Sequence, residues 1–234
     1  MLFRSHKIMV KDELKQQEAA IGEAVSKTEA FFEKNSKTFV AAVVAFCVVV
    51  GGVYGYRKLV AEPRVEKASE LIAEAQYRFE QENPNYELAL NGDENGAGFL
   101  DVIEQYGSTP AGNLAKHYAG ICYLKSGDLA NAEAYLTKFS PVKGLPGQII
   151  NAQNIGLQGD IAVENGDLEA AVKLFAKAVK ASDNLFTAPL YLRKQGLALK
   201  ALGRQEEAAA AFEKILAAYP ASIDAREAEK LLGE

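Results

Sequence analysis

The stretch GLALKALGRQEEAAAAFEKILAAYP, residues 196–220, contains the pattern that decides the fold of this chain. A glycine is followed by a second glycine seven positions later, by an alanine five positions after that, and by a large apolar residue four positions further on. At this composition about 0.04 matches are expected by chance in 234 residues. Three occur, at spacings of 39 and 37 residues, so the chain contains an internal repeat. The copies are Gly120, Gly127, Ala132 and Leu136; Gly159, Gly166, Ala171 and Phe175; and Gly196, Gly203, Ala208 and Phe212.

Each position of the pattern suits a hairpin of two antiparallel helices. The first glycine and the alanine are expected where the two helices approach closely, because a larger side chain there would push them apart. The second glycine is expected to end the first helix in a left-handed turn, and Asp128 and Asp167, which follow it, to cap the second helix. The large apolar residue is expected to fill the space against the next hairpin. The pattern therefore predicts an all-α stack of helical hairpins.

These residues resemble the tetratricopeptide repeat, most closely at Gly196, Ala208, Phe212 and Pro220. The resemblance extends over about residues 63–233, with a degenerate first pair of helices. It implies a helical-hairpin solenoid whose first helices line a concave groove. It also implies that this groove binds a peptide segment or a partner helix.

On the family's pattern, nine side chains face the groove. A groove that clamps two carboxylates needs an asparagine where this chain has Ile121, so recognition of that kind is not expected. The last three residues of the set are basic and come from one helix. Either they meet an acidic segment or the carboxylate end of a peptide, or Asp160, Glu164 and Asp183 of the neighbouring hairpin neutralise them. The nine residues are Asn113, His117, Lys125, Gln153, Asp160, Glu164, Arg193, Lys194 and Lys200.

Helices are also predicted on both sides of the repeats. Apolar residues recur at helical spacing in residues 63–82 and again in residues 99–106. Between them, ENPNYELALNGDENGAG, residues 82–98, combines Asn-Pro and Asn-Gly pairs and is predicted to be a loop. A last helix begins at Ser222 and is expected to close the stack. Its apolar residues are Ala225, Ala228 and Leu231.

Further towards the N-terminus, FVAAVVAFCVVVGGVYGY, residues 39–56, is a run of apolar and small residues without a charge. Eighteen residues of helix cover about 27 Å, close to the roughly 30 Å of hydrocarbon in a bilayer. Lys34 and Lys37 before the run, and Arg57 and Lys58 after it, are placed to reach the lipid headgroups. The run predicts a single transmembrane helix. A buried core helix would rarely be apolar on every face. A cleaved signal is not expected, since 38 residues precede the run.

Small residues occupy one face of this predicted transmembrane helix. Such a face lets another membrane helix approach closely, and a pair of small residues four positions apart is typical of it. We therefore expect a packing surface for a partner helix here, although such pairs also occur by chance. The residues are Ala41, Ala45, Gly51, Gly52 and Gly55.

The chain is thus expected to have three parts: an N-terminal arm, residues 1–38, partly helical; the transmembrane helix, residues 39–56; and a repeat domain, residues 57–234. The arm is either an amphipathic helix lying on the membrane or on a partner, or a weakly ordered tail. The repeat domain carries nineteen Lys and Arg against twenty-five Asp and Glu, which gives no sign of nucleic-acid binding.

The sequence contains no constellation that predicts catalysis. It has no P-loop, no GxGxxG after a strand, no GxSxG, no HExxH and no CxxC. His117 is the only histidine of the repeat domain, and neither it nor His6 has a second ligand at metal-binding spacing. Cys47 and Cys122 cannot form a disulfide framework, because one lies in the predicted span. We expect no enzyme activity, no cofactor, no metal and no small-molecule substrate.

The order of segments resembles a narrower group. FFEKNSKTF, the span, YGYRKLVAEPRVEKASELIAEAQ and then repeats is similar to the YfgM-like single-span proteins related to the ancillary subunit of the bacterial SecYEG translocon. The resemblance implies a single-pass protein of the bacterial inner membrane, with a cytoplasmic N-terminus and a periplasmic repeat domain. It implies an accessory factor that contacts membrane lipid, translocon subunits, exported chains and a membrane-anchored periplasmic chaperone.

Two other functions stay open at this point. One is a structural anchor in an envelope complex that leaves the groove empty. The other is a regulator that sequesters a cytosolic protein, which requires the opposite orientation. The local count of positive charges on the two sides of the span does not settle the orientation.

Overall fold

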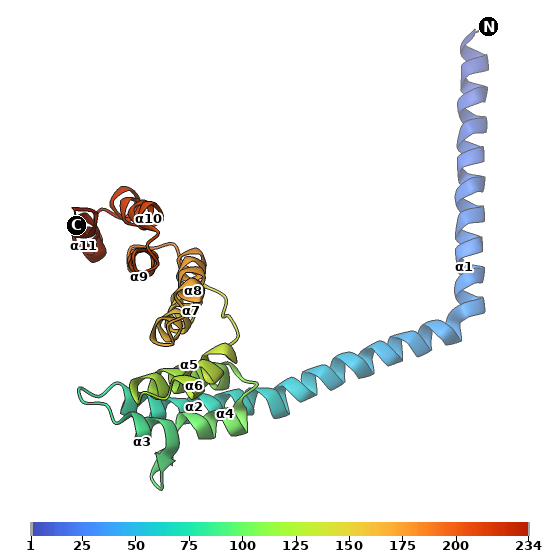
Figure 1. Cartoon of the computed structure of the whole chain (residues 1–234). Coiled ribbons are helices and arrows are strands. Elements are labelled where there is room, and N and C mark those ends of the chain that lie inside the picture. Colours follow the sequence, from blue (N-terminus) through green and yellow to red (C-terminus); the bar gives the residue numbers. More distant parts are fainter. Residues whose placement is uncertain (1, 234) are drawn as a thin grey trace. The chain divides into compact units, whose positions relative to one another are not determined.

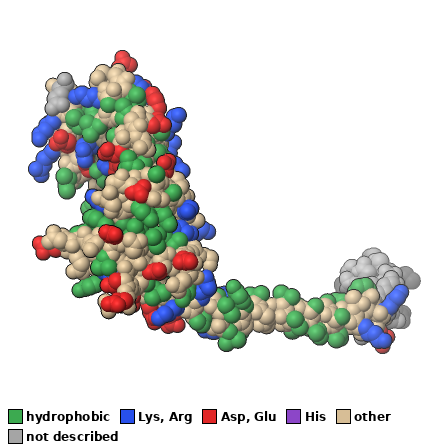
Figure 2. Space-filling model, turned by 60° about the horizontal axis from the view of Figure 1, so that its bottom comes forward, with side chains coloured by type: hydrophobic (Ala, Val, Ile, Leu, Met, Phe, Trp, Pro, Cys, Tyr) green, Lys and Arg blue, Asp and Glu red, His purple; other side chains and the backbone are tan. Residues whose placement is uncertain are grey.

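The computed structural model describes residues 2–233, which fall into two compact units, Met1–Glu62 and Pro63–Glu234. The first unit contains helix α1, Leu2–Tyr56, and a five-residue π-helical turn, η1, Arg57–Ala61. Apolar side chains cover the predicted span on its exposed surface (Figure 2). By length and composition this helix can cross a membrane, since its most apolar eighteen residues have a mean hydropathy of 2.2 and none of them is buried.

The second unit consists of helices and one very short hairpin of strands, in the part of the chain that the structure describes (Figure 1). Three helices precede the repeats, six form antiparallel pairs, and one ends the unit. This confirms the predicted all-α stack of hairpins. The helices are α2 (Glu62–Phe79), α3 (Tyr86–Asn91), α4 (Phe99–Tyr106), α5 (Pro110–Lys125), α6 (Leu129–Thr137), α7 (Leu145–Glu164), α8 (Leu168–Ala181), α9 (Thr187–Ala201), α10 (Gln205–Ala218) and α11 (Ile223–Gly233).

The turns inside the three pairs form as the repeat pattern predicts. Gly127, Gly166 and Gly203 have φ angles of 82°, 78° and 77°, a region that L side chains rarely adopt. The Asp128 carboxylate accepts a hydrogen bond from the backbone N–H of Asn131 at 3.0 Å and caps α6. Asp167 caps α8 in the same way. These local rules fix where each first helix ends and each second helix begins.

The large apolar residue of each repeat also packs against the glycine of its own hairpin. A Cβ atom on Gly159 would lie 2.6 Å from a ring carbon of Phe175, and one on Gly196 would lie 2.3 Å from a ring carbon of Phe212. Gly120 is matched to Leu136 in the same manner. The residue therefore fills the space beside the glycine of its own hairpin and also packs against the next helix pair, as Phe175 does against Tyr191 and Leu136 against Ile161. The pattern pairs the glycine with the large apolar residue because the large side chain occupies the space that a Cβ atom on the glycine would need.

Two large apolar clusters and one small cluster make up the core. One lies among α2, α3, α4 and α5 and includes Phe99 and Val102. The other continues through α7 to α11 and includes Phe175 and Phe212. The predicted closing helix is confirmed, because Ala225 and Ala228 are buried in this second cluster and Leu231 packs against it. The small cluster, between α6 and α7, contains Ala132, Leu136 and Ile161.

The prediction of a loop at residues 82–98 is corrected by the structure. The Asn85 side chain accepts a hydrogen bond from the backbone N–H of Leu88 and begins helix α3. Strands β1, Gly92–Asp93, and β2, Gly96–Ala97, then pair antiparallel. Asparagines and glycines that are typical of loops here serve as a helix cap and as the turn of a hairpin.

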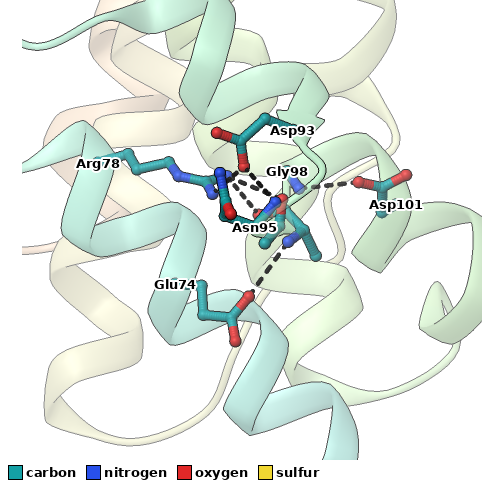
Figure 3. Close-up of polar contacts among 8 residues, drawn as sticks. Glu74, Arg78, Asp93, Asn95, Gly98 and Asp101 are labelled. Carbon is teal, nitrogen blue, oxygen red and sulfur yellow. Dashed lines mark hydrogen bonds and ion pairs between the residues drawn. The ribbon is translucent and has the colours of Figure 1, made fainter.

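Side chains of α2 hold this hairpin of strands (Figure 3). The Arg78 guanidinium donates to the carbonyl oxygens of Gly96 and Ala97 at 3.0 and 3.2 Å and pairs with the Asp93 carboxylate at 2.7 Å. The Glu74 carboxylate accepts from the backbone N–H of Ala97 at 3.1 Å. Because these charged side chains form hydrogen bonds with backbone groups of the hairpin of strands, they stabilise the beginning of the helical stack.

Candidate protein-binding site

An open cleft of about 710 Å³ lies on the repeat domain, where the first helices of the three hairpins end. Its walls come from the last turns of α5, α7 and α9 and from the beginnings of α6 and α8. Apolar side chains form most of its surface. They include Ile121, Leu124, Leu157, Val163, Phe175 and Leu197.

The apolar lining stays in contact with solvent although the helices around it are packed. Val163 is 40% exposed and Leu197 39% exposed, whereas Phe175 is buried beneath them. Burying apolar area is favourable by about 25 cal/mol per Å². A concave surface of this size, apolar with a few charged groups at its edge, is typical of a binding site.

Four ionised side chains line the same cleft. Lys194 of α9 pairs with Asp160 of α7 at 2.7 Å and lies 5.9 Å from the centre of the Phe175 ring. Lys125, at the end of α5, and Glu164, at the end of α7, are exposed. Neither of these two has an ion-pair partner among the residues that the structure describes. The cleft thus combines an apolar floor with one neutralised pair and two unpaired charges of opposite sign.

The structure brings together four of the nine side chains predicted for the groove, namely Lys125, Asp160, Glu164 and Lys194. Gln153 is exposed on α7 but does not line the cleft. Lys200, on α9, is partly buried and also lies outside the lining. Asn113, His117 and Arg193 take part in contacts within the domain.

His117 and Asn113 lie where α5 meets the next hairpin. His117 is only 3% exposed, and its Nδ1 atom is 3.3 Å from the Asn154 amide nitrogen on α7. Burial lowers the pKa of the imidazole to about 4. The Asn113 amide donates to the carbonyl oxygen of Ser140 and accepts from its backbone N–H, both at 2.8 Å. Both side chains therefore hold the stack together. His117 is buried and not presented to a ligand, whereas Asn113 is partly exposed and its role in the groove stays a prediction.

The basic stripe of α9 is neutralised inside the domain. The Arg193 guanidinium donates to the Asp224 carboxylate of α11 at 2.6 Å, while Lys194 pairs with Asp160. Asp183 accepts a hydrogen bond from the Tyr219 hydroxyl and is not the partner of either cation. This geometry favours the interpretation in which neighbouring carboxylates neutralise the stripe, with Asp224 in a place that the sequence did not suggest.

The apolar floor is the part of the site that sequence reasoning missed. The repeat pattern predicts Leu124, Leu157 and Leu197 neither as groove residues nor as core residues. Leu157 and Leu197 lie two positions before Gly159 and one position after Gly196, near the ends of helices that approach each other. A signal was available, because large apolar residues recur beside the repeat glycine on a face that the hairpin's second helix does not cover.

Other candidate sites can be stated briefly. Within residues 2–233 no group of three or more His, Cys, Asp or Glu side chains is arranged to hold a metal ion. In the predicted span, a Cβ atom on Gly51, Gly52 or Gly55 would meet nothing within 4 Å. That face is open to a partner helix, and its role in packing stays a prediction.

Comparison with known proteins bears on the repeats. Residues 157–223 match the tetratricopeptide repeat family. Among solved structures, MamA resembles this chain with a TM-score of 0.44 and 20% sequence identity, over 58% of this chain and 75% of the MamA chain. No curated protein matches the chain. Tetratricopeptide-like repeats act as scaffolds for protein–protein interaction, and the cleft lies on these repeats.

Proposed function

We propose that this chain is a membrane-anchored scaffold, without catalytic activity, whose repeat domain binds an apolar segment of a partner protein. The observation that supports this is the cleft of about 710 Å³ whose apolar floor stays partly exposed at the ends of three consecutive first helices. An amphipathic helix or an extended segment that places apolar side chains on this floor would bury surface on both partners. The charged edge would restrict how the segment lies.

The proposed anchor is the apolar part of α1. Its length and hydropathy fit a bilayer. The resemblance of the order of segments to the single-span repeat proteins supports a cytoplasmic N-terminus and a periplasmic repeat domain in a bacterial cell. A large domain can cross the membrane largely regardless of its charge, so the balanced charges around the span are compatible with this orientation. Protease added to intact spheroplasts should remove the repeat domain, and complete protection would reverse the orientation.

The proposed partners are translocon subunits, exported chains near them, and a membrane-anchored periplasmic chaperone. The resemblance of the whole order of segments supports this assignment, and an apolar cleft suits the unfolded stretches of exported chains. In this role the chain would meet a partner at the membrane surface and hold it there by many weak contacts.

The test is site-specific photo-crosslinking in cells, with a photoreactive residue in place of Leu197 in the cleft. The matched control places the same residue at Lys173, which is exposed on α8 and does not line the cleft. We expect crosslinked partners at Leu197 and not at Lys173, and loss of the crosslinks when Leu157→Asp is introduced beside it. Identical crosslinks at both positions, unaffected by Leu157→Asp, would show that the cleft is not the binding site.

A further inference from the structure

The two unpaired charges of the cleft come from adjacent first helices. Lys125 is the basic residue in the last turn of α5, and Glu164 is the last residue of α7. Among the described residues, the other ionised groups that line the cleft are Asp160 and Lys194, which are paired with each other at 2.7 Å. A ligand that enters the cleft therefore meets two side chains of opposite sign whose charges are not yet compensated.

Glu164 occupies a position where a carboxylate is not favoured by its own helix. The C-terminal end of a helix carries a partial negative charge, so cations are preferred there. Lys125 follows this rule on α5, whereas α7 has no basic residue in its last turn. A cationic group of a ligand beside Glu164 would compensate both the carboxylate and the helix end.

The floor of the cleft favours an apolar side chain. Leu157, Val163 and Leu197 are apolar, and the Asp160–Lys194 pair already satisfies its own charges. A charged group of the ligand placed here would lose water without gaining a partner, which is costly. A ligand side chain such as leucine would instead gain contact with the floor.

We propose that the cleft selects a segment of mixed charge, in which apolar residues are accompanied by both a carboxylate and a lysine or arginine. The inference rests on the proposed function, because it assigns the chemistry of the segment that the cleft binds. The carboxylate pairs with Lys125 and the cation with Glu164. A wholly acidic segment leaves one of its charges opposite Glu164, and a wholly basic one leaves a charge opposite Lys125.

The experiment uses the full chain in lipid nanodiscs and three fluorescent helical peptides that share one leucine-rich face. One peptide has an acidic and a basic flank, the second has two acidic flanks, and the third has two basic flanks. Dissociation constants are measured by anisotropy at low and at high salt, with empty nanodiscs as the blank. We expect the mixed peptide to bind about three- to fivefold more tightly than the others at low salt, as partly exposed ion pairs allow. The advantage should shrink at high salt.

Charge reversals on the protein make the test specific. Lys125→Glu leaves two carboxylates at the edge and should shift the preference to the basic peptide, while Glu164→Lys should shift it to the acidic peptide. Lys173→Glu, on α8 outside the cleft, changes the net charge by the same amount as Lys125→Glu and should leave the order of affinities unchanged.

The outcomes separate this inference from the proposed function. Equal affinities for the three peptides, together with loss of binding in Leu197→Asp, would overturn the charge selection and leave the apolar cleft as the binding site. The same shift in Lys173→Glu as in Lys125→Glu would also overturn it, because the effect would then be one of net charge. Affinities for all peptides that Leu197→Asp does not change, or no binding at all, would overturn both proposals.

Discussion

The joint between the pairs α5–α6 and α7–α8, here the first joint, differs from the second joint, between α7–α8 and α9–α10. At the second joint one continuous apolar cluster runs from α7 to α11, and the Phe175 ring of α8 stacks on the Tyr191 ring of α9 with centroids 6.4 Å apart. At the first joint the buried members of the shared cluster are Ala132, Leu136 and Ile161, and the residues packed against them are only partly buried. The same repeat pattern thus produces one joint with a large apolar core and one with a small core.

Uncharged polar side chains link the helices of the first joint to each other and to the segment that connects the pairs. Asn113 of α5 and Asn151 of α7 each form two hydrogen bonds with the segment that connects the pairs, at Ser140 and at Val142. His117 contacts Asn154 of α7. At the second joint the polar contacts between the pairs are ion pairs, Lys194 with Asp160 at 2.7 Å and Arg204 with Glu169 at 3.0 Å. Asn184, in the segment that connects these pairs, bonds to residues of its own turn.

The two joints differ in what their contacts supply, stability or a fixed orientation. Apolar burial supplies most of the stability but is not directional, whereas hydrogen bonds fix an orientation at a smaller net gain of about 0.5–1.5 kcal/mol each. Because the first joint relies on polar contacts, apolar residues of α5 and α7 such as Leu124 and Leu157 are not fully buried there. The cleft includes these residues, and it extends across α7 to α9.

The largest expected effect separates the cores of the two joints. Phe175→Ala should reduce the free energy of unfolding by about 4 kcal/mol, because it empties a buried space against Gly159 and removes the ring stacked on Tyr191. Leu136→Ala, the matched change at the first joint, should cost about 3 kcal/mol. Urea unfolding of the full chain in detergent, followed by circular dichroism, measures both. A larger loss for Leu136→Ala would contradict the ranking of the two joints.

The next effect concerns acid and is confined to the first joint. Burial lowers the pKa of His117 to about 4 from its ordinary 6.5, so between these values the unfolded chain binds a proton that the folded chain does not. The stabilisation by the neutral imidazole is complete above pH 6.5 and is lost as the pH falls towards 4, by at most about 3 kcal/mol.

The comparison with His117→Gln isolates this contribution. Glutamine can keep a hydrogen bond to Asn154 but does not titrate. The unfolding free energy of the wild type should therefore fall relative to that of His117→Gln as the pH is lowered from 7 to 4. A difference that stays constant over this range would mean that His117 is not held neutral by burial.

The sequence predicted the hairpins because the signals that make them are local. Gly166 and Asp167 act within one turn of chain, and Gly159 and Phe175 recur at a fixed distance within one hairpin. In contrast, Asn85 was interpreted as a loop residue, because the same side chain that favours a turn also caps a short helix such as α3.

The site was predicted only in part, for a physical reason. A family pattern states which face of a first helix is concave, and this was enough to identify Lys125 and Glu164. It does not state which partner a side chain meets across a joint. Asn154 is 37 residues from His117, and Asp224 is 31 residues from Arg193, so the contacts that occupy these two predicted groove residues depend on tertiary packing.

The smallest expected effect tests whether the asparagines orient the first joint. Asn113→Ala removes the two hydrogen bonds between the Asn113 side chain and the backbone of Ser140. Because Ser140 is exposed, the loss of stability should be only about 1 kcal/mol. Asn184→Ala, at the second joint, should cost a similar amount of stability because Asn184 caps a turn.

Hydrogen exchange of the backbone should nevertheless distinguish the two variants. In Asn113→Ala we expect faster exchange in residues 138–144 and in the first turn of α7, since the link from α5 to this segment is lost. In Asn184→Ala the faster exchange should stay within residues 182–187, because the apolar core of the second joint still holds α8 against α9. Faster exchange that spreads through α9 in Asn184→Ala would contradict the role of the apolar core in holding the second joint.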